Sequence, residues 1–169
     1  MIRAARDDDR AAMLAIVNDA AHAYQGVIPA DRWHEPYMGA DELAGEIAAG
    51  IRFSVAELDG RIVGVMGIQD RGDVALVRHA YVSSGSQKRG IGGALLRDVL
   101  GRTDKPVLIG TWAAATWAIA FYERYGFVVV PPDVKNRLLG KYWSIPARQV
   151  ETSVVLADAR WIARHRATG

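Results

Sequence analysis

Cysteine is absent from this chain of 169 residues. Its absence excludes disulfides, thiolate metal sites and a cysteine nucleophile. Histidine is scarce, because the four histidines are scattered along the chain and none has the HExxH spacing of a zinc site. We therefore expect no metal cofactor.

An excess of one charge is also lacking, since 21 Lys and Arg residues balance 19 Asp and Glu residues. This balance predicts no nucleic-acid partner, because such proteins carry a basic face. No apolar run approaches the roughly 18 residues of a membrane span. The charged start MIRAARDDDR does not resemble a signal peptide. The sequence therefore predicts a cytoplasmic protein with no membrane partner.

The residues that are present are typical of a globular protein, with 50% hydrophobic and 24% charged residues. No repeat or linker interrupts the chain, so residues 1–169 are predicted to form one domain. Apolar spacing predicts a meander of strands followed by strands that alternate with helices, which is a mixed α/β (α+β) class. Strands are expected near 2–5, 53–58, 61–70, 74–82, 105–113, 127–130 and 148–158, and helices near 10–24, 40–49, 91–100, 115–126 and from 158, with a loop at 133–147.

The same pattern predicts one turn and the faces on which two side chains lie. Asp59-Gly60 between two strands predicts a tight hairpin with positive φ. Strand alternation in VALVRHAYV places Arg78 on one face and His79 on the other. We interpret His79 as a packed or capped histidine in preference to a catalytic base.

The stretch SQKRGIGGAL, residues 86–95, contains three glycines between a predicted strand and a predicted helix. A dinucleotide-binding fold would have GxGxxG in its first βαβ unit, and a P-loop would have GxxxxGK[ST]. Neither pattern fits, so two interpretations stay open. The glycines form a flexible turn, or they open a helix whose free N–H groups bind a phosphate.

The residues QKRGIG, 87–92, match the pyrophosphate motif of the GNAT superfamily of acyl-CoA-dependent N-acyltransferases, which the chain resembles. A second match begins at residue 118, where AIAFYERYGF is similar to the A-I-x-F-Y-E-x-x-G-F signature of that superfamily. The resemblance covers residues 2–156. It implies a mixed, mostly antiparallel sheet of about seven strands, flanked by helices and splayed at the cofactor site.

The resemblance also implies acetyl-CoA as cosubstrate and assigns roles to particular residues. The N–H group of Val82 polarises the thioester carbonyl, and Tyr122 donates a proton to the departing thiolate. A phenol suits this second role because its usual pKa of about 10 keeps it neutral beforehand. Tyr122 as a core aromatic is the alternative. The implied coenzyme-binding residues are Ala80, Tyr81, Val82, Gln87, Lys88, Arg89, Gly90, Ile91, Gly92, Gly93, Ala94, Ala115, Phe121 and Tyr122.

The sequence departs from the family at three positions. Ala115 stands where the family often has an Asn that touches pantetheine, and Leu76 and Gly110 stand where some members have a catalytic Glu. His34 and Glu35 are candidate bases. Aromatic side chains either wall an acceptor pocket or belong to the core. The candidate acceptor residues are Tyr24, Trp33, His34, Glu35, Tyr37, Arg78 and Trp112.

Together these residues predict an N-acetyltransferase that moves an acetyl group from acetyl-CoA to a primary amine, by direct attack in a ternary complex. The acceptor is expected to be a small molecule. The alternative is a non-catalytic acyl-CoA sensor or partner-interaction module with the same fold. The final strand and the loop at 133–147 are candidate surfaces for a homodimer.

Overall fold

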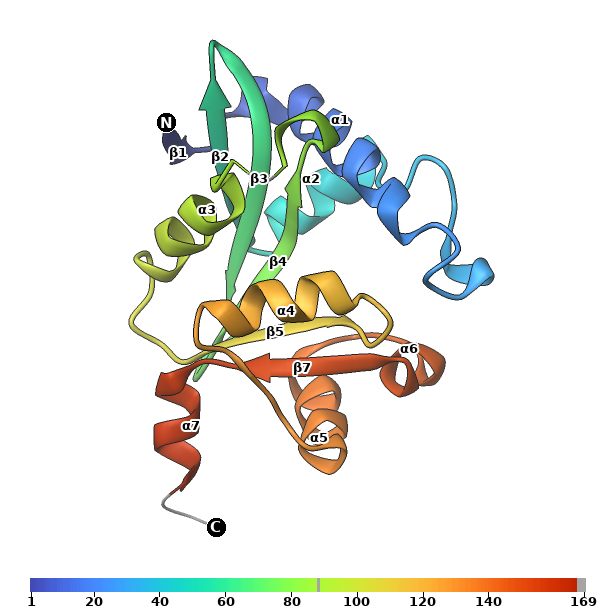
Figure 1. Ribbon diagram of the computed structural model, residues 1–169, viewed down its shortest axis with the longest axis vertical. Helices are drawn as coiled ribbons and strands as arrows, with labels where there is room; N and C mark the ends of the chain where they lie inside the picture. The colour runs from blue at the N-terminus through green and yellow to red at the C-terminus, as the bar shows by residue number, and fades with distance from the viewer. Residues whose placement is uncertain (88, 167–169) are drawn as a thin grey trace. The chain divides into compact units, whose positions relative to one another are not determined.

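The computed structural model describes residues 1–87 and 89–166. Its seven strands form a sheet in the order β1-β2-β3-β4-β5-β7-β6, and helices flank the strands (Figure 1). The predicted mixed α/β class with about seven strands is confirmed. The strands are β1 Ile2–Ala4, β2 Arg52–Leu58, β3 Arg61–Asp70, β4 Ala75–Val82, β5 Val107–Trp112, β6 Val128–Val129 and β7 Ser153–Ala157.

The helices fall close to their predicted positions in the first two thirds of the chain. The first expected helix is divided, because α1 ends at Ala20 and a 3-10 turn, Ala21–Tyr24, follows it. The helices are α1 Arg10–Ala20, α2 Ala40–Ala48, α3 Ile91–Leu100, α4 Thr116–Arg124, α5 Pro132–Tyr142, α6 Ala147–Glu151 and α7 Ala159–Arg166.

The chain divides into two compact units. The first comprises Met1–Asp70 and Val77–Asp104, and the second comprises Arg71–Leu76 and the residues from Lys105 onward. Strand β4 therefore begins in the second unit and continues in the first. One domain over residues 1–169 stays a prediction.

In the first unit, β1, β2 and β3 are antiparallel neighbours. The β2–β3 hairpin turns at Asp59 and Gly60, whose φ angles of 51° and 76° confirm the predicted turn. Helix α3 packs against β2 and β3, and α1 packs against β3 and α2 (Figure 1).

These helices cover opposite faces of the first unit. A Cβ atom at Gly64 would approach Leu95 of α3 to 2.9 Å, whereas the next residue, Val65, belongs to the core under α1 and α2. Neighbouring residues of a strand point to opposite faces. The hydroxyl of Ser54 on β2 also donates to Asp98 of α3 at 2.6 Å. Helix α3, and with it the glycine-rich stretch at its start, is thus fixed to the strands.

In the second unit, α5 and α7 pack on β7 around a core that includes Leu108, Leu139, Val155 and Trp161. Gly110 of β5 lies against the ring of Trp143, where a Cβ atom would come within 3.2 Å of the indole. A larger side chain at this position would require the indole of Trp143 to move.

The predicted loop at 133–147 is wrong, because α5 and the start of α6 occupy this segment. The predicted strand 127–130 ends directly before the pair Pro131-Pro132, and Pro132 begins a helix. It stands in the first turn of α5, where its missing N–H is tolerated, and Asp133 follows it there. The apolar side chains of Leu138, Leu139 and Tyr142 then cover the core.

The predicted final strand, 148–158, is also too long. Residues up to Glu151 form α6, and β7 begins at Ser153. The carbonyls of Pro146 and Arg148 accept helix-type hydrogen bonds from Val150 and Thr152. Pro146 therefore precedes a helix in the same way as Pro131 does. The candidate dimer surface at 133–147 is a helical one.

Candidate active site

The glycine-rich stretch connects the end of β4 to the first turn of α3. Gly90 precedes the helix in the left-handed region, with φ of 76°, and its carbonyl accepts the N–H of Ala94 at 3.1 Å. A non-glycine residue rarely adopts this conformation. The N–H groups of the next three residues, Ile91, Gly92 and Gly93, have no carbonyl four residues back within the helix.

The exposed side of this loop is suited to bind an anion. Gln87, Arg89 and Gly90 are exposed. The first-turn N–H groups and the positive end of the α3 dipole favour negative charge. The N–H of Ala94, for which the resemblance also implies a coenzyme contact, donates to the carbonyl of Gly90. Lys88 lies outside the described residues.

Residues of α1, β3 and β4 fix the beginning of this loop. The carboxylate of Asp19 accepts the N–H and the hydroxyl of Ser84, at 2.8 and 3.1 Å. The N–H of Ser83 donates to Val63 of β3 at 2.8 Å. The side-chain amide of Gln87 donates to the carbonyl of Val82 at 3.3 Å. The first residue of the motif therefore stabilises the turn that follows β4.

Arg78 and His79 of β4 both reach Glu46 of α2, which no sequence pattern singled out. The Nε2 atom of His79 lies 2.6 Å from the Oε2 atom of Glu46, and the guanidinium of Arg78 lies 3.4 Å from the same oxygen. Arg78 also donates to Gln69 of β3 at 3.0 Å. We call Glu46, Gln69, Arg78 and His79 the Glu46 cluster.

The predicted placement of Arg78 and His79 on opposite faces is therefore wrong. His79 has a φ of 54°, which interrupts the extended conformation on which strand alternation depends. The expected packing of the His79 ring is observed, because it lies 6.1 Å from the ring of Phe53, centroid to centroid.

In the Glu46 cluster, the carboxylate of Glu46 faces the basic side chains of Arg78 and His79. The hydrogen bond from His79 lowers the pKa of Glu46, and the partial burial of the carboxyl opposes this effect. A carboxylate can only accept, so Nε2 of His79 carries the shared proton, and in a neutral ring Nδ1 is then the acceptor. Glu46 lies three residues after the buried Leu43. This helical spacing was the one sequence signal that could have placed it on the inner side of α2.

The segment between α1 and α2 gathers several of the expected acceptor residues. Trp33 stacks on Tyr37 at 5.5 Å between ring centroids, and His34 stacks on the same ring at 6.1 Å. Tyr24 meets Tyr81 of β4 edge to face at 6.4 Å. We call these two groups of rings, Tyr24 with Tyr81 and Tyr37 with Trp33 and His34, the aromatic cluster.

The two candidate bases in this segment are already partnered. Nδ1 of His34 lies 2.7 Å from the carbonyl of Pro36. The carboxylate of Glu35 lies 3.3 Å from His22, and both side chains are more than half exposed. Neither contact holds the side chain in a protected position, whereas the Glu46 cluster is partly buried.

The remaining expected residues lie in the second unit. Tyr122 of α4 is 7% exposed and meets Phe121 and Phe127 at ring distances of 5.1 and 6.0 Å. Ala115 is fully buried immediately before α4, and its carbonyl accepts the N–H of Ile119. Trp112 is the last residue of β5 and is opposite Ser153 of β7. The packed ring of Tyr122 is also what the core-aromatic alternative expects.

The described residues contain no group of three or more His, Asp and Glu side chains arranged to hold a metal ion. Within the same residues, no helix is long and apolar enough to cross a membrane.

The sequence of this chain matches the model of the acetyltransferase (GNAT) domain over residues 18–139. Among curated proteins, none matches it. Several solved structures share its fold. The PaiA N-acetyltransferase of Thermoplasma acidophilum, solved with coenzyme A, has a TM-score of 0.72 and 16% identity, over 94% of this chain and 97% of that one.

Two further structures are similar to a comparable degree. A GNAT-family acetyltransferase of Staphylococcus aureus Mu50 has a TM-score of 0.70 and 16% identity, over 94% of this chain and 97% of that one. The ribosomal-protein-alanine N-acetyltransferase of Brucella melitensis has a TM-score of 0.64 and 21% identity, over 93% and 97%.

Proposed function

Because the chain belongs to the GNAT acetyltransferase family, we propose that it transfers the acetyl group of acetyl-CoA to a primary amine of a small molecule. The observation that carries the proposal is the Gly90 turn, which opens α3 directly after β4 with a φ of 76°. The structure of the Thermoplasma neighbour, solved with coenzyme A, supports the choice of cosubstrate.

In this proposal the N–H groups of Ile91, Gly92 and Gly93 bind the pyrophosphate of the coenzyme. Arg89, which is exposed beside them, adds positive charge. Backbone groups of Ala80, Tyr81 and Val82 on β4 bind the pantetheine arm, and the N–H of Val82 polarises the thioester carbonyl. Acetyl-CoA supplies the acetyl group in an activated form, as a thioester.

Tyr122 is the proposed proton donor to the sulfur. Its hydroxyl gives up a proton as the carbon–sulfur bond breaks, so that the leaving group departs as a neutral thiol. The packed rings of Phe121 and Phe127 hold the phenol ring in one orientation. Ala115 has no polar side-chain atom to offer the coenzyme, and the whole residue is buried.

His79 is the proposed acceptor of the proton that the amine loses when its nitrogen bonds to the acetyl carbon. Glu46 fixes the ring by its contact of 2.6 Å with Nε2, which leaves Nδ1 to take the proton. The negative charge of Glu46 stabilises the imidazolium that forms. His79 directly precedes Ala80, so the proposed base and the first proposed pantetheine contact lie on adjacent residues of β4.

The aromatic cluster is the proposed wall of the acceptor site. Its contact between Tyr24 and Tyr81 joins the segment after α1 to β4, next to Val82. Flat aromatic faces favour a compact and partly apolar amine over a long basic peptide. Tyr37 and Tyr81 also pack on the core of the first unit, which gives this wall a rigid support.

The test is the release of free thiol from acetyl-CoA in the presence of a panel of amines. Release that depends on one class of amine, with the acetylated amine as product, is expected. Binding of acetyl-CoA without release for any amine would favour the acyl-CoA sensor. The buried Ala115, which lacks a polar side chain toward the coenzyme, is the observation in favour of that alternative.

A variant separates catalysis from binding. Tyr122→Phe is expected to lower turnover at least tenfold and to leave the affinity for acetyl-CoA, measured by calorimetry, within twofold of the wild type. The ring and its packing are kept and only the hydroxyl is lost. An unchanged rate with a true acceptor would remove Tyr122 from the mechanism.

A further inference from the structure

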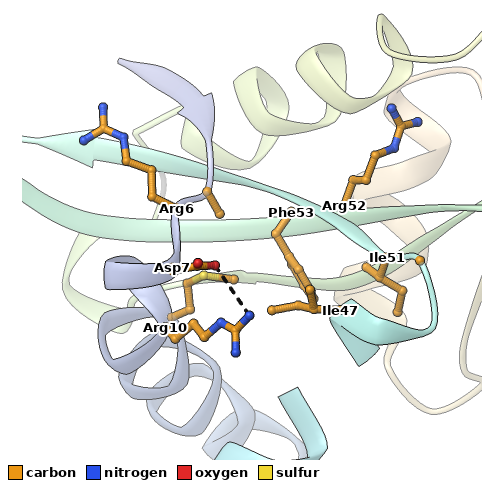
Figure 2. A pocket seen from close by; sticks show the side chains of 10 residues that line it. Arg6, Asp7, Arg10, Ile47, Ile51, Arg52 and Phe53 are labelled. Carbon is orange, nitrogen blue, oxygen red and sulfur yellow. Dashed lines mark ion pairs between the residues drawn. The ribbon is translucent and has the colours of Figure 1, made fainter. Parts of the chain in front are cut away.

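A pocket of about 280 Å³ lies in the first unit, between the beginning of α1 and the segment that joins α2 to β2 (Figure 2). Its apolar wall comprises Met13, Ile47, Ile51 and Phe53, three of which are less than 8% exposed. This volume is slightly below the roughly 300 Å³ at which ligand pockets for drug-sized molecules begin. The space therefore suits a small organic molecule.

Three arginines line the same pocket, and Asp7 is the single acidic residue among its lining residues. Arg10 reaches toward the apolar wall, whereas Arg6 and Arg52 extend to the outside on either flank (Figure 2). The lining thus carries two positive charges in excess. Such an excess beside an apolar wall attracts an organic anion.

Arg10 is only weakly engaged within the protein. Its guanidinium lies 3.5 Å from the carboxylate of Asp7, whose side chain is fully exposed. Exposed ion pairs of this kind are readily exchanged because water screens them. The Nε atom of Arg10 is buried and has no hydrogen-bond partner among the described residues. A buried donor of this kind favours the entry of an acceptor.

The pocket is separate from the proposed coenzyme loop. Its lining comes from the segments 5–13 and 47–53, whereas the proposed pyrophosphate groups lie at 87–93. The ring of Phe53, which lines the pocket, also lies 6.1 Å from His79 of the Glu46 cluster. The pocket is thus a neighbour of that cluster and uses none of its four residues.

We propose that this pocket binds a small carboxylate with a compact apolar body. The guanidinium of Arg10 donates two parallel N–H hydrogen bonds to the carboxylate of the ligand, which takes the place of the Asp7 carboxylate. The apolar body lies against Ile47 and Phe53, and Arg6 and Arg52 contribute attraction from the rim. This proposal does not depend on the acetyltransferase function.

The test uses 4-phenylbutyrate and its neutral analogue 4-phenylbutan-1-ol as probes. Titrations of the ¹⁵N-labelled full chain by NMR give the affinity and the residues whose amide signals shift. We expect the carboxylate to bind at least tenfold more tightly than the alcohol, with the largest shifts at 5–13 and 47–53. Equal binding of both probes, or shifts confined to other residues, would overturn the proposal.

Variants of Arg10 connect the binding to the proposed contact. Arg10→Met keeps most of the aliphatic stem and is expected to weaken the binding of the carboxylate at least tenfold. The matched control is Arg61→Met, an exposed arginine at the start of β3 outside the pocket, which should bind as the wild type does. Equal losses in both variants would show general charge attraction and would contradict a site at Arg10.

Two further measurements distinguish the loss of the Arg10 contact from the loss of the fold. Thermal unfolding and NMR spectra of each variant report whether the fold is intact. Arg10→Lys keeps the positive charge but cannot donate two parallel hydrogen bonds. Its affinity for the carboxylate should therefore fall between those of the wild type and Arg10→Met. If Arg10→Met unfolds, an unchanged affinity in Arg10→Lys would by itself contradict the bidentate contact.

Discussion

Replacing Asp9 by Asn tests the contacts that join the N-terminal strand to the helix that follows it. Asp9 is 8% exposed. Its carboxylate accepts two hydrogen bonds from the guanidinium of Arg3, at 2.7 and 3.0 Å, and one from the N–H of Arg6 at 2.7 Å. These bonds lower the pKa of Asp9 from 3.8 to about 2, against the opposing effect of burial.

The size of the effect follows from this pKa. A tenfold change in proton affinity corresponds to about 1.4 kcal/mol, so the full shift corresponds to about 2.4 kcal/mol. Arg3 lies on the edge strand β1 and Asp9 in the turn before α1, where solvent screens part of the attraction. We therefore expect Asp9→Asn to lower the free energy of unfolding by about 1 to 2 kcal/mol at pH 7.

The dependence on pH has a definite sign. The folded-state pKa is depressed, so the stabilisation is fully present above the unfolded value of 3.8 and is lost as the pH falls toward about 2. The difference between the wild type and the variant should thus be about half as large at pH 3 as at pH 7.

Urea denaturation at several pH values, followed by circular dichroism, measures this difference. Asp8→Asn is the matched control, because Asp8 is exposed on the same turn and its replacement should change stability by less than about 0.5 kcal/mol. A loss for Asp9→Asn that stays constant between pH 7 and pH 3 would refute the electrostatic reasoning. A loss no larger than that of the control would refute it as well.

The remaining predictions concern the proposed active site. Gly92→Val should weaken the binding of acetyl-CoA at least tenfold in calorimetry, because a branched side chain would stand between the coenzyme and the first-turn amides of α3. The control is Gly140→Val on α5, where a Cβ atom would meet no other atom within 4 Å. Equal affinities in Gly92→Val and the wild type would remove the pyrophosphate assignment. Glu46→Gln should lower kcat about 10-fold to 100-fold, because the neutral amide no longer stabilises the imidazolium of His79, and should leave the KM for acetyl-CoA within twofold. Glu42→Gln, exposed one turn earlier on α2, should keep the wild-type kcat, and a variant Glu46→Gln with unchanged kcat would exclude His79 with Glu46 as the base.

The sequence was sufficient to predict the glycine turn and the class of fold, because both depend on local patterns. Gly90 stands between a β-type run and a helical run, and it directly precedes α3 with a φ of 76°. The strand segments follow from the spacing of apolar residues and from turn residues such as Asp59-Gly60, and the resemblance to the GNAT superfamily implied that about seven strands form one sheet.

The misplaced elements and contacts have identifiable physical causes. A proline pair ends a strand and also begins a helix, so Pro131-Pro132 alone did not reveal α5. Strand alternation placed Arg78 and His79 apart, but the positive φ of His79 brings both to Glu46. Glu46 is 32 and 33 residues away from them along the chain, and tertiary packing alone brings these side chains together.

The proposed transfer is tested most directly by following the acetyl group itself. The protein is mixed with acetyl-CoA labelled in the acetyl carbonyl, first without an amine and then with the amine that gives thiol release. Direct attack in a ternary complex predicts that the label appears on the amine, in an amount equal to the free CoA, and that no label is bound to the protein before the amine is added. Label on the protein in the absence of amine, or label recovered only as acetate, would contradict the proposed transfer.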